Sequence, residues 1–360
     1  MTSAATYPKI RLGGPDGPLV SAIGFGAMSI GAAAYGVTDE KAALETLTRA
    51  ADLGTTFWDT SDAYGASQRY IGKWFKETGR RKEIFFATKF GTADTTKPVH
   101  SPGYWKLNSK PSFVKMKVEE ALRECQTDYI DLFYQHRVDP EVPVEVVMEA
   151  LRPYVENGTI KWIGISEPSI EVLRRAKAVP VVGPKIIAAQ MEFSPFCMEI
   201  ESSGFAAAAK ELGVSIIAYS PLGRGMMTGQ FTSRDQFEPG DIRHFMPRFS
   251  EENFSANLVV VDKFKVVAQK HNVTPGQVTL AWILARHPDF VSIPGTRSVK
   301  RLEENAQAVN VKLDEEDLKL LNEAVEVADV KGERFPPAFA HIMNQDCIPL
   351  SEWKGEITTA

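Results

Sequence analysis

The chain has 360 residues, of which 44% are hydrophobic and 24% are charged, a composition typical of a globular protein. Its net charge of −5 gives no electrostatic reason to expect a nucleic acid or an anionic membrane as a partner. The sequence has no run of about 18 apolar residues, and residues 1–9 have no apolar core flanked by positive charge. We therefore expect a cytoplasmic protein that does not span a membrane.

The three cysteines, Cys125, Cys197 and Cys347, are odd in number and far apart in the sequence. This pattern fits neither a disulfide framework nor the ligand spacing of a zinc site. Free cysteine most often serves as a small buried hydrophobe, so we interpret all three as reduced core residues, with a reactive thiol as the alternative. No metal site is predicted.

The N-terminal part predicts a β-hairpin, since the short strand-like stretches 9–12 and 19–23 flank the glycine-rich turn 13–17. Such a hairpin could close the bottom of a barrel. The first barrel strand is expected to end at Gly24–Met28. A helix that begins at Thr38 or Asp39, with an acid at its start, is expected to run to about residue 53.

After residue 53, strand and helix patterns alternate along the chain. Eight strands, each followed by a helix, predict a right-handed (β/α)8 barrel, an α/β fold of the TIM-barrel type. The further strands are expected at 55–59, 84–89, 130–136, 160–166, 186–192, 214–219 and 290–293, and the helices at about 67–79, 112–125, 143–157, 169–178, 199–212, 257–271, 275–287 and 298–309.

Three long segments interrupt this alternation, and long loops in a compact domain are usually functional. We expect them to roof the active-site face of a barrel domain, residues 1–330, with residues 331–360 as a C-terminal tail folded over that face. The alternative is that their apolar residues only pin the loops to the barrel. The segments are 91–111, with Tyr104 and Trp105; 223–256, with Phe231, Phe237, Phe245 and Phe249; and 331–360, with Pro336, Pro337, Phe339, Met343 and Trp353.

Three of the expected strands end in ionisable side chains. Asp59 ends the second barrel strand and Tyr64 lies in the loop that follows, while Lys89 and His136 end the next two strands. Because active sites of parallel barrels lie at the C-terminal ends of the strands, these side chains should meet on one face. Singly, each is more often a solvated turn residue. Together they suit proton donation to a carbonyl oxygen, because a lysine cation lowers a phenol pKa that is normally near 10.

The spacing of Asp59, Tyr64, Lys89 and His136 resembles the catalytic tetrad of the aldo-keto reductases. The resemblance extends over nearly the whole chain, and matches at so many ordered places are specific. It implies reduction of an aldehyde or ketone, with hydride from the nicotinamide of NADPH and a proton from Tyr64. The other matching motifs are Gly24–Met28, Gly164–Ser166, Gln190, Ala218–Gly223, Ile293–Thr296 and Glu304–Asn305.

The expected mechanism gives each tetrad residue a role. Lys89 lowers the pKa of Tyr64, Asp59 pairs with Lys89, and His136 donates a hydrogen bond that orients the substrate carbonyl. The aromatic content of the long loops favours aryl or bulky apolar carbonyls, such as benzaldehydes or pyridoxal, as substrates. The sequence predicts no oligomeric state.

The cofactor is expected to bind to the barrel itself. No Gly-x-Gly-x-x-Gly motif follows a predicted strand, so a separate Rossmann domain is not expected. A barrel can instead hold phosphates in the loops after its seventh and eighth strands, here 220–224 and 295–298, the second of which opens a helix.

Arg297, Lys300 and Arg301 place three cations at the start of that helix, where a cation opposes the helix dipole. An anionic ligand would explain them, and the planar fork of arginine suits a phosphate. The alternative is a solvated helix face paired with Glu303 and Glu304. The resemblance makes Arg301 a partner of the adenosine 2′-phosphate, which implies NADPH rather than NADH.

The resemblance assigns further cofactor contacts to residues on the same face. Tyr219 matches the residue that stacks on nicotinamide, and Ser166, Glu167 and Gln190 match those that hold its carboxamide. Many relatives have asparagine where this chain has Glu167, and a carboxylate can accept the carboxamide N–H but cannot donate. The full predicted set is Gly26, Ala27, Met28, Ser166, Glu167, Gln190, Tyr219, Ser220, Pro221, Leu222, Gly223, Arg224, Pro294, Gly295, Thr296, Arg297, Arg301, Glu304 and Asn305.

Two other functions stay open at this point. Potassium-channel β subunits resemble the same family, so the chain could be a nicotinamide-sensing regulatory subunit. Against this, only about eight residues precede the hairpin, which leaves no long N-terminal gate. A structural barrel that has lost catalysis is disfavoured, because all four tetrad residue types are present.

Overall fold

The structure is a computed structural model, and it describes residues 7–32, 39–98, 101, 103–343 and 345–356. Several predictions fall partly outside these described residues, namely the helix start at Thr38, positions 99, 100 and 102 of the loop 91–111, and positions 344 and 357–360 of the tail. Among the described residues, no helix is long and apolar enough to cross a lipid bilayer.

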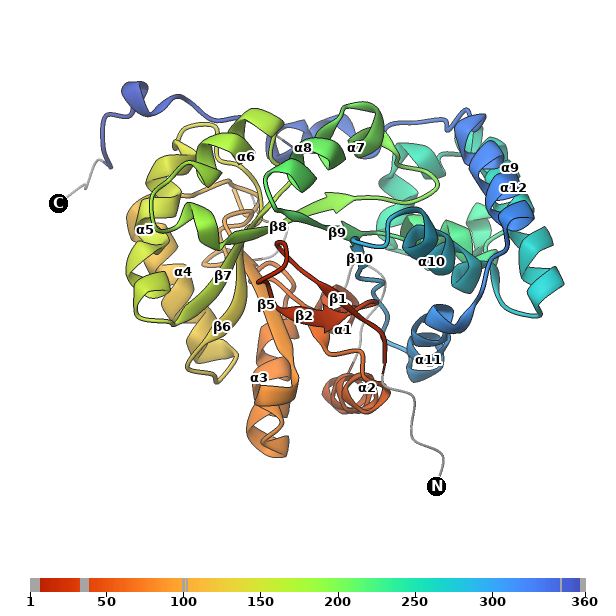
Figure 1. Cartoon of the computed structure of the whole chain (residues 1–360), viewed down its shortest axis with the longest axis horizontal. Coiled ribbons are helices and arrows are strands. Elements are labelled where there is room, and N and C mark those ends of the chain that lie inside the picture. Colours follow the sequence, from red (N-terminus) through yellow and green to blue (C-terminus); the bar gives the residue numbers. More distant parts are fainter. Residues whose placement is uncertain (1–6, 33–38, 99–100, 102, 344, 357–360) are drawn as a thin grey trace.

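The described part of the chain contains an eight-stranded parallel sheet whose strands follow one another in sequence order. Parallel bridges between Ile23 and Ser292 and between Gly26 and Gly295 join its two edges, so the sheet closes. The predicted (β/α)8 barrel is confirmed, and Figure 1 shows the helices arranged around the strands. The strands are β3 (Phe25–Gly26), β4 (Phe57–Asp59), β5 (Phe85–Phe90), β6 (Ile130–Gln135), β7 (Ile160–Ser166), β8 (Ile186–Glu192), β9 (Ser215–Tyr219) and β10 (Val291–Ser292).

The helices follow the prediction with four differences. The helix expected at 199–212 is two short helices, because Gly204 between them has a left-handed φ of +77°. The helix expected from 257 begins at Glu251, with Ser250 as its N-cap. The helices are α1 (Met28–Gly31), α2 (Glu40–Leu53), α3 (Ser67–Thr78), α4 (Pro111–Glu124), α5 (Val144–Glu156), α6 (Ile170–Lys177), α7 (Glu199–Ser202), α8 (Phe205–Glu211), α9 (Glu251–His271), α10 (Pro275–Arg286), α11 (Val299–Gln307) and α12 (Glu315–Glu326). Two helices, α1 and α12, were not among those predicted.

The predicted N-terminal hairpin is present and covers the N-terminal end of the barrel. β1 (Lys9–Arg11) pairs antiparallel with β2 (Leu19–Ser21). The turn between them lies against the start of β9, where the backbone N–H of Gly13 donates to Ser215 Oγ at 3.0 Å. Leu12 is fully buried in the cluster of side chains that fills the barrel. The opposite end of the barrel is therefore the one open to a ligand.

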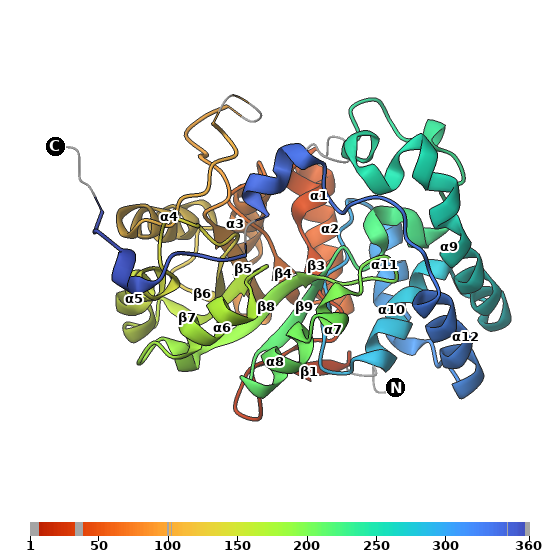
Figure 2. The ribbon, with the colours of Figure 1, turned by 90° about the horizontal axis from the view of Figure 1, so that it is seen from above.

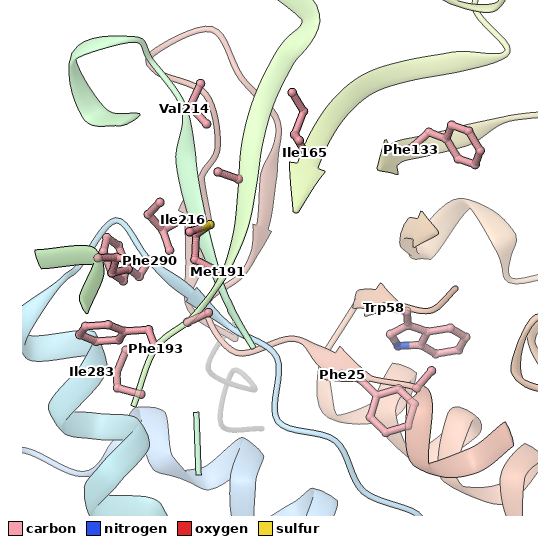
Figure 3. Packing of buried hydrophobic residues seen from close by; sticks show 14 of the residues in the cluster. Phe25, Trp58, Phe133, Ile165, Met191, Phe193, Val214, Ile216, Ile283 and Phe290 are labelled. Carbon is pink, nitrogen blue, oxygen red and sulfur yellow. The ribbon is translucent and has the colours of Figure 1, made fainter. Parts of the chain in front are cut away.

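Alternation along the strands decides which side chains reach the barrel interior. Trp58 points outward, and its ring centroid lies 4.7 Å from that of Trp74 on α3. Figure 3 shows Trp58 among the buried residues of this large core cluster, together with Phe133 and Ile165. Because successive side chains of a strand point to opposite faces, Asp59, the neighbour of Trp58, points into the barrel. The apolar pattern of the strand thus positions the acid.

The segment that follows β9 packs on itself through aromatic rings. The centroid of Phe237 lies 5.1 Å from that of Phe231 and 5.8 Å from those of Phe249 and Phe254. Phe237 and Phe249 are buried, whereas Phe245 is 68% exposed. For Phe237 and Phe249 the alternative interpretation therefore applies, since these rings attach the segment to α9 rather than line an open face.

The C-terminal tail runs from α12 on one side of the barrel to α5 on the other, as Figure 2 shows by its blue trace. The backbone N–H of Ser169, just before α6, donates to the carbonyl oxygen of Gln345 at 2.9 Å. The ring of Phe339 in the tail meets that of Trp105 in the loop 91–111, with centroids 6.3 Å apart. The tail and this loop therefore contact each other.

Candidate active site

The four predicted catalytic residues come together at the C-terminal ends of β4, β5 and β6. Lys89 Nζ lies 2.5 Å from Asp59 Oδ1 and donates to the backbone oxygen of Thr60 at 2.8 Å. Asp59 Oδ2 accepts a hydrogen bond from Gln190 Nε2 at 2.8 Å. Both members of the ion pair are buried, and the additional hydrogen bonds offset the loss of their hydration.

Tyr64 lies in the loop between β4 and α3, with its hydroxyl oxygen 3.4 Å from Lys89 Nζ. The His136 ring meets the Tyr64 ring edge to face, with centroids 5.7 Å apart and planes at 86°. The phenol is therefore flanked by an ammonium group and an imidazole.

The direction of the Tyr64 pKa differs from the sequence expectation. Burial raises the pKa of Tyr64 above the usual 10.0, and Lys89, which favours the phenolate, only partly opposes this effect. The predicted effect of Lys89 has the expected direction, but the net pKa is raised because removal of the phenol from water is the larger effect. Tyr64 keeps its proton at neutral pH, which is the state that a proton donor needs.

His136 is buried and neutral. Burial lowers the pKa of His136 well below its usual value, and the cations Lys89 and Arg137 act in the same direction. Its Nδ1 atom lies 3.0 Å from the hydroxyl oxygen of Ser61. A neutral imidazole carries a single N–H, so His136 can donate only one hydrogen bond at a time.

A groove of about 400 Å³ extends from Asp59 and Tyr64 to the start of α11. Four residues of the predicted cofactor set, Ala27, Ser166, Glu167 and Gly223, are buried and do not line it, and neither do Lys89 and His136. The predicted residues that do line the groove are Gly26, Met28, Gln190, Tyr219, Ser220, Pro221, Leu222, Arg224, Pro294, Gly295, Thr296, Arg297, Arg301, Glu304 and Asn305.

Two arginines border the groove where α11 begins. Arg301 donates to the side-chain oxygen of Gln230 at 3.0 Å, and Arg297 Nη2 lies 3.9 Å from Glu238 Oε2. Gln230 and Glu238 belong to the long segment after β9 and also line the groove. This segment therefore forms the wall of the groove opposite α11.

The acids that would pair with these arginines on a solvated helix face have other partners. Glu303 accepts a hydrogen bond from Arg49 Nε at 2.7 Å, and Glu304 accepts one from the Thr274 hydroxyl at 2.7 Å. An anion at this place would also receive backbone N–H groups of the first turn of α11 other than that of Arg301, which Ser298 caps. These contacts favour the anionic-ligand interpretation of the cationic cluster.

Glu167, which was predicted to hold the nicotinamide carboxamide, is held by contacts within the protein. Its Oε1 atom accepts hydrogen bonds from the Tyr219 hydroxyl at 2.9 Å and from Arg334 Nη2 at 2.8 Å. Its Oε2 atom is buried and has no hydrogen-bond partner among the described residues. The side chain has no exposed surface and does not line the groove, so this oxygen is closed to a ligand in this structure.

The backbone at this end of the barrel is unusual at three non-glycine residues. Glu167, Ser220 and Arg224 have left-handed φ angles of 54°, 50° and 54°. Such conformations cost about 1–3 kcal/mol each and persist where surrounding contacts fix them, which is common at functional sites. They mark the ends of β7 and β9 as a site that is held in one conformation.

Arg334, in the tail, is the main residue of this site that sequence reasoning missed. Besides Glu167, it donates to Glu192 Oε2 at 3.1 Å and to the Tyr219 hydroxyl oxygen at 2.9 Å. A single arginine in a segment without periodicity shows no pattern in the sequence. The available signal was the pair of acids at the ends of β7 and β8, because two buried carboxylates need cations.

Replacing Arg334 with alanine should lower the free energy of unfolding by about 2–3 kcal/mol, because a buried carboxylate loses its nearest cation. Although burial acts to raise it, Arg334 and Arg137 hold the pKa of Glu167 below its usual 4.5 in the native protein. A lowered carboxyl pKa stabilises the fold above its unfolded pKa, and this contribution is lost as the pH falls through the folded pKa. The deficit of the variant should therefore be complete above about pH 4.5 and shrink at lower pH.

Urea unfolding of the native protein and the Arg334→Ala variant at pH 7 and pH 4 measures this difference. The matched control is Arg69→Ala, since Arg69 is 60% exposed and its ion pair with Glu124 spans 3.5 Å. The control should cost less than about 1 kcal/mol. Equal deficits of the Arg334 variant at both pH values would contradict the assigned role of the buried carboxylate.

Fold and site together define the class of barrel oxidoreductases that use a nicotinamide dinucleotide. The model of the Aldo/keto reductase family matches residues 22–326, and the chain belongs to this family. The aldo-keto reductase yakc of Schizosaccharomyces pombe, whose name includes NADP(+), is 45% identical over 92% of this chain and 96% of its own length. The aldo-keto reductase str7 of Strobilurus tenacellus is 46% identical over 88% of this chain and 92% of its own.

A solved structure supports the same fold. The glycerol dehydrogenase of Gluconobacter oxydans superposes with a TM-score of 0.78, covering 93% of this chain and 99% of its own. Its sequence identity to this chain is 24%, so the likeness shows the common barrel and nothing about the substrate.

Proposed function

We propose that this protein reduces the carbonyl group of an aldehyde or ketone to an alcohol with NADPH as cofactor. The observation that carries the proposal is the contact of Tyr64 with the buried Lys89–Asp59 ion pair at the end of the groove. The Schizosaccharomyces pombe relative carries NADP(+) in its name, which supports the same cofactor here.

In the proposed reaction, Tyr64 donates its proton to the carbonyl oxygen. Lys89 stabilises the phenolate that remains, because its ammonium lies 3.4 Å from the phenol oxygen. Asp59 holds Lys89 in place and balances its charge. Bound NADPH supplies the hydride that reduces the carbonyl carbon. His136 is neutral, so it does not act as a cationic acid, and it orients the carbonyl by a hydrogen bond when its single N–H faces the substrate.

We assign the groove to the cofactor. Arg297 and Arg301 would hold the 2′-phosphate, since they border the groove at the N-terminus of α11. Tyr219 would stack on the nicotinamide, and Gln190, which also lines the groove, would hold its carboxamide.

We assign substrate selection to the tail, residues 331–360, as a segment distinct from the barrel domain, residues 1–330. The edge-to-face contact of Trp105 with Phe339 links the loop 91–111 to this tail. Aromatic side chains supply a large contact area to flat apolar groups. Aryl aldehydes such as benzaldehyde, and bulkier carbonyls such as pyridoxal, are therefore the proposed substrate class.

Ending the chain after Pro336 should change substrate selectivity more than the fold, because the barrel strands are complete by Ser292. The loss of one aromatic contact should lower the preference for benzaldehyde over propanal about two- to tenfold in kcat/KM. The matched control is a chain that ends after Glu333, which also loses Arg334 and should in addition be less stable. An insoluble product of the first truncation, or an unchanged preference, would contradict the assignment.

Oxidation of NADPH, followed in the steady state with a panel of aldehydes and ketones, tests the proposed function. We expect turnover within the range typical of enzymes, about 1–10³ s⁻¹, for at least one aryl aldehyde. Binding of NADPH without turnover of any carbonyl would overturn the proposal and leave a cofactor-sensing role.

A further inference from the structure

A chain of polar contacts leads from His136 away from the reaction site. Ser61 Oγ lies 3.0 Å from His136 Nδ1 and 3.0 Å from Asp62 Oδ1. Asp62 Oδ2 lies 3.3 Å from Nζ of Lys117 on α4. Ser61 and Lys117 are 1% and 2% exposed, so these polar contacts are shielded from water. Ser61, Asp62 and Lys117 take no part in the proposed reaction.

The number of hydrogen atoms shared by Asp62, Ser61 and His136 limits which hydrogen bonds these residues can make. Ser61 has one hydroxyl hydrogen, and a neutral imidazole has one N–H. An ionised Asp62 can only accept a hydrogen bond, so the Ser61 hydroxyl donates to it. The Ser61 oxygen can then only accept from His136, which requires the imidazole hydrogen to be on Nδ1. In that state His136 Nε2 carries a lone pair and cannot donate to a carbonyl.

The opposite arrangement needs a protonated Asp62. Its carboxyl hydrogen is donated to Ser61 Oγ, the Ser61 hydroxyl is donated to Nδ1, and the imidazole hydrogen sits on Nε2. The interconversion adds one proton overall. A proton arrives at Nε2 from solvent, the Nδ1 hydrogen passes to Ser61, and the Ser61 hydrogen passes to Asp62.

We propose that Ser61 and Asp62 are positioning residues that determine which ring nitrogen of His136 carries the proton. The charged state of Asp62 places it on Nδ1, and the neutral state of Asp62 places it on Nε2, where it can bind the substrate carbonyl. The effect on substrate binding rests on the proposed function, whereas the tautomer of His136 can be measured without any reaction.

Other contacts around Ser61 limit the hydrogen bonds that its hydroxyl can make. The backbone N–H of Ala63 donates to Ser61 Oγ at 3.2 Å, so one lone pair of this oxygen is already used. The backbone N–H of Asp62 donates to the carbonyl oxygen of Lys89 at 3.3 Å. Ser61 therefore has its hydroxyl hydrogen and one lone pair left to share between Asp62 and His136.

The charges that face Asp62 come from α4 and from the loop 91–111. Lys117 Nζ donates to Glu120 Oε2 at 2.8 Å as well as facing Asp62. Tyr104 lies close enough that the charge of Asp62 contributes to raising the pKa of its phenol, after burial. Burial raises the pKa of Asp62 to about 6, with Lys117 opposing and Glu120 adding to the rise. Asp62 therefore changes charge in the range where enzymes work.

The charges that face His136 are those of Lys89 and Arg137, which together with burial keep the ring neutral. Tyr64 meets the same ring edge to face. Because the ring does not become cationic near pH 6, its response to Asp62 is a change of tautomer. The carbonyl should bind more tightly below about pH 6 than above it.

Nitrogen NMR of the NADP⁺-saturated protein, labelled with [¹⁵N]histidine, reads the tautomer directly. The chain has six histidines, and the His136 signals are identified by their loss in a His136→Asn variant. At pH 7.5 we expect the proton of His136 on Nδ1, and on acidification to pH 5 a change to Nε2 with a midpoint near the Asp62 pKa of about 6. One unchanged tautomer from pH 5 to pH 8 would overturn the proposal without the use of any variant.

The variant Asp62→Asn should place the proton on Nε2 at both pH values, because the amide donates to Ser61 and frees the hydroxyl for Nδ1. Its KM for benzaldehyde at pH 7.5 should fall roughly two- to tenfold, the range for one neutral hydrogen bond, with kcat changed much less. The variant Ser61→Ala should lose the pH response of the tautomer.

The matched control is Glu120→Gln, which removes a charge beside Lys117 but leaves the contacts of Ser61 with Asp62 and His136. It should keep the pH switch of the tautomer, with its midpoint lowered, since Glu120 raises the pKa of Asp62. At pH 7.5, an Asp62→Asn spectrum identical to the native one would overturn the inference while carbonyl reduction stands. A tautomer switch in a protein that reduces no carbonyl would overturn the proposed function while the inference stands.

Discussion

The variant Tyr64→Phe should lose carbonyl reduction by at least about 10²-fold in kcat, the usual contribution of a general acid. Only the hydroxyl is removed, and the ring that packs edge to face against His136 remains. Lys89 keeps its contacts with Asp59 and the backbone oxygen of Thr60, so the site should not collapse. Stopped-flow absorbance of NADPH oxidation with benzaldehyde measures the loss.

Binding of NADPH to this variant, measured by quenching of intrinsic fluorescence, serves as the control and should be nearly unchanged. The hydroxyl of Tyr64 contacts Lys89 and no residue of the arginine end of the groove. Half of the native turnover in Tyr64→Phe would show that another group supplies the proton. His136 would then be the next candidate.

The double variant Arg297→Ala, Arg301→Ala should weaken NADPH binding while barely changing NADH binding, because only NADPH carries the 2′-phosphate. A charge-assisted contact of about 1.5–3 kcal/mol corresponds to roughly ten- to a hundredfold in affinity for each arginine. Both arginines border the groove at the start of α11 and face Gln230 or Glu238 across it.

Dissociation constants for both cofactors, measured at one fixed salt concentration because charge contacts are screened, decide this prediction. The matched control is Arg49→Ala. Arg49 pairs with Glu303 of α11, the helix of Arg301, but it does not line the groove. It should leave both constants unchanged. Equal weakening of NADPH and NADH in the double variant would place these arginines at the adenine or at the barrel wall.

The barrel and the geometry of the tetrad could be predicted because they follow from local patterns. Apolar side chains such as Trp58 and Phe86 alternate with residues that point inward, and this alternation delivers Asp59 and Lys89 into the barrel. Because the strands of such a barrel are parallel, their C-terminal ends lie on one face, and no knowledge of contacts between distant residues is needed to predict this. The same reasoning placed His136 beside Tyr64.

The parts that were missed depend on contacts between segments distant in the sequence. Arg334 lies 167 residues from Glu167, and no periodicity in the tail indicates that the two meet. The net direction of the Tyr64 pKa also depends on how much water the fold removes, which the sequence does not show. By contrast, α12 had a readable start, since Asp314 and Asp317 form a capping box.

Tail and loop positions were harder for the same reason. Phe237 and Phe249 look alike in the sequence to rings that line a pocket, and only packing against Phe254 on α9 shows that they anchor the segment. Ser61 and Asp62 read as ordinary turn residues, and their place beside His136 becomes visible only when β6 lies next to the loop after β4.

Transfer of deuterium tests the central claim most directly. The native protein is mixed with NADPH deuterated at the transferable position of its nicotinamide and with benzaldehyde, and the alcohol is analysed by mass spectrometry. Reduction by direct hydride transfer predicts benzyl alcohol with one deuterium on its carbon, and almost none from Tyr64→Phe in the same time. Unlabelled alcohol, or no alcohol although the labelled cofactor is bound, would contradict the account.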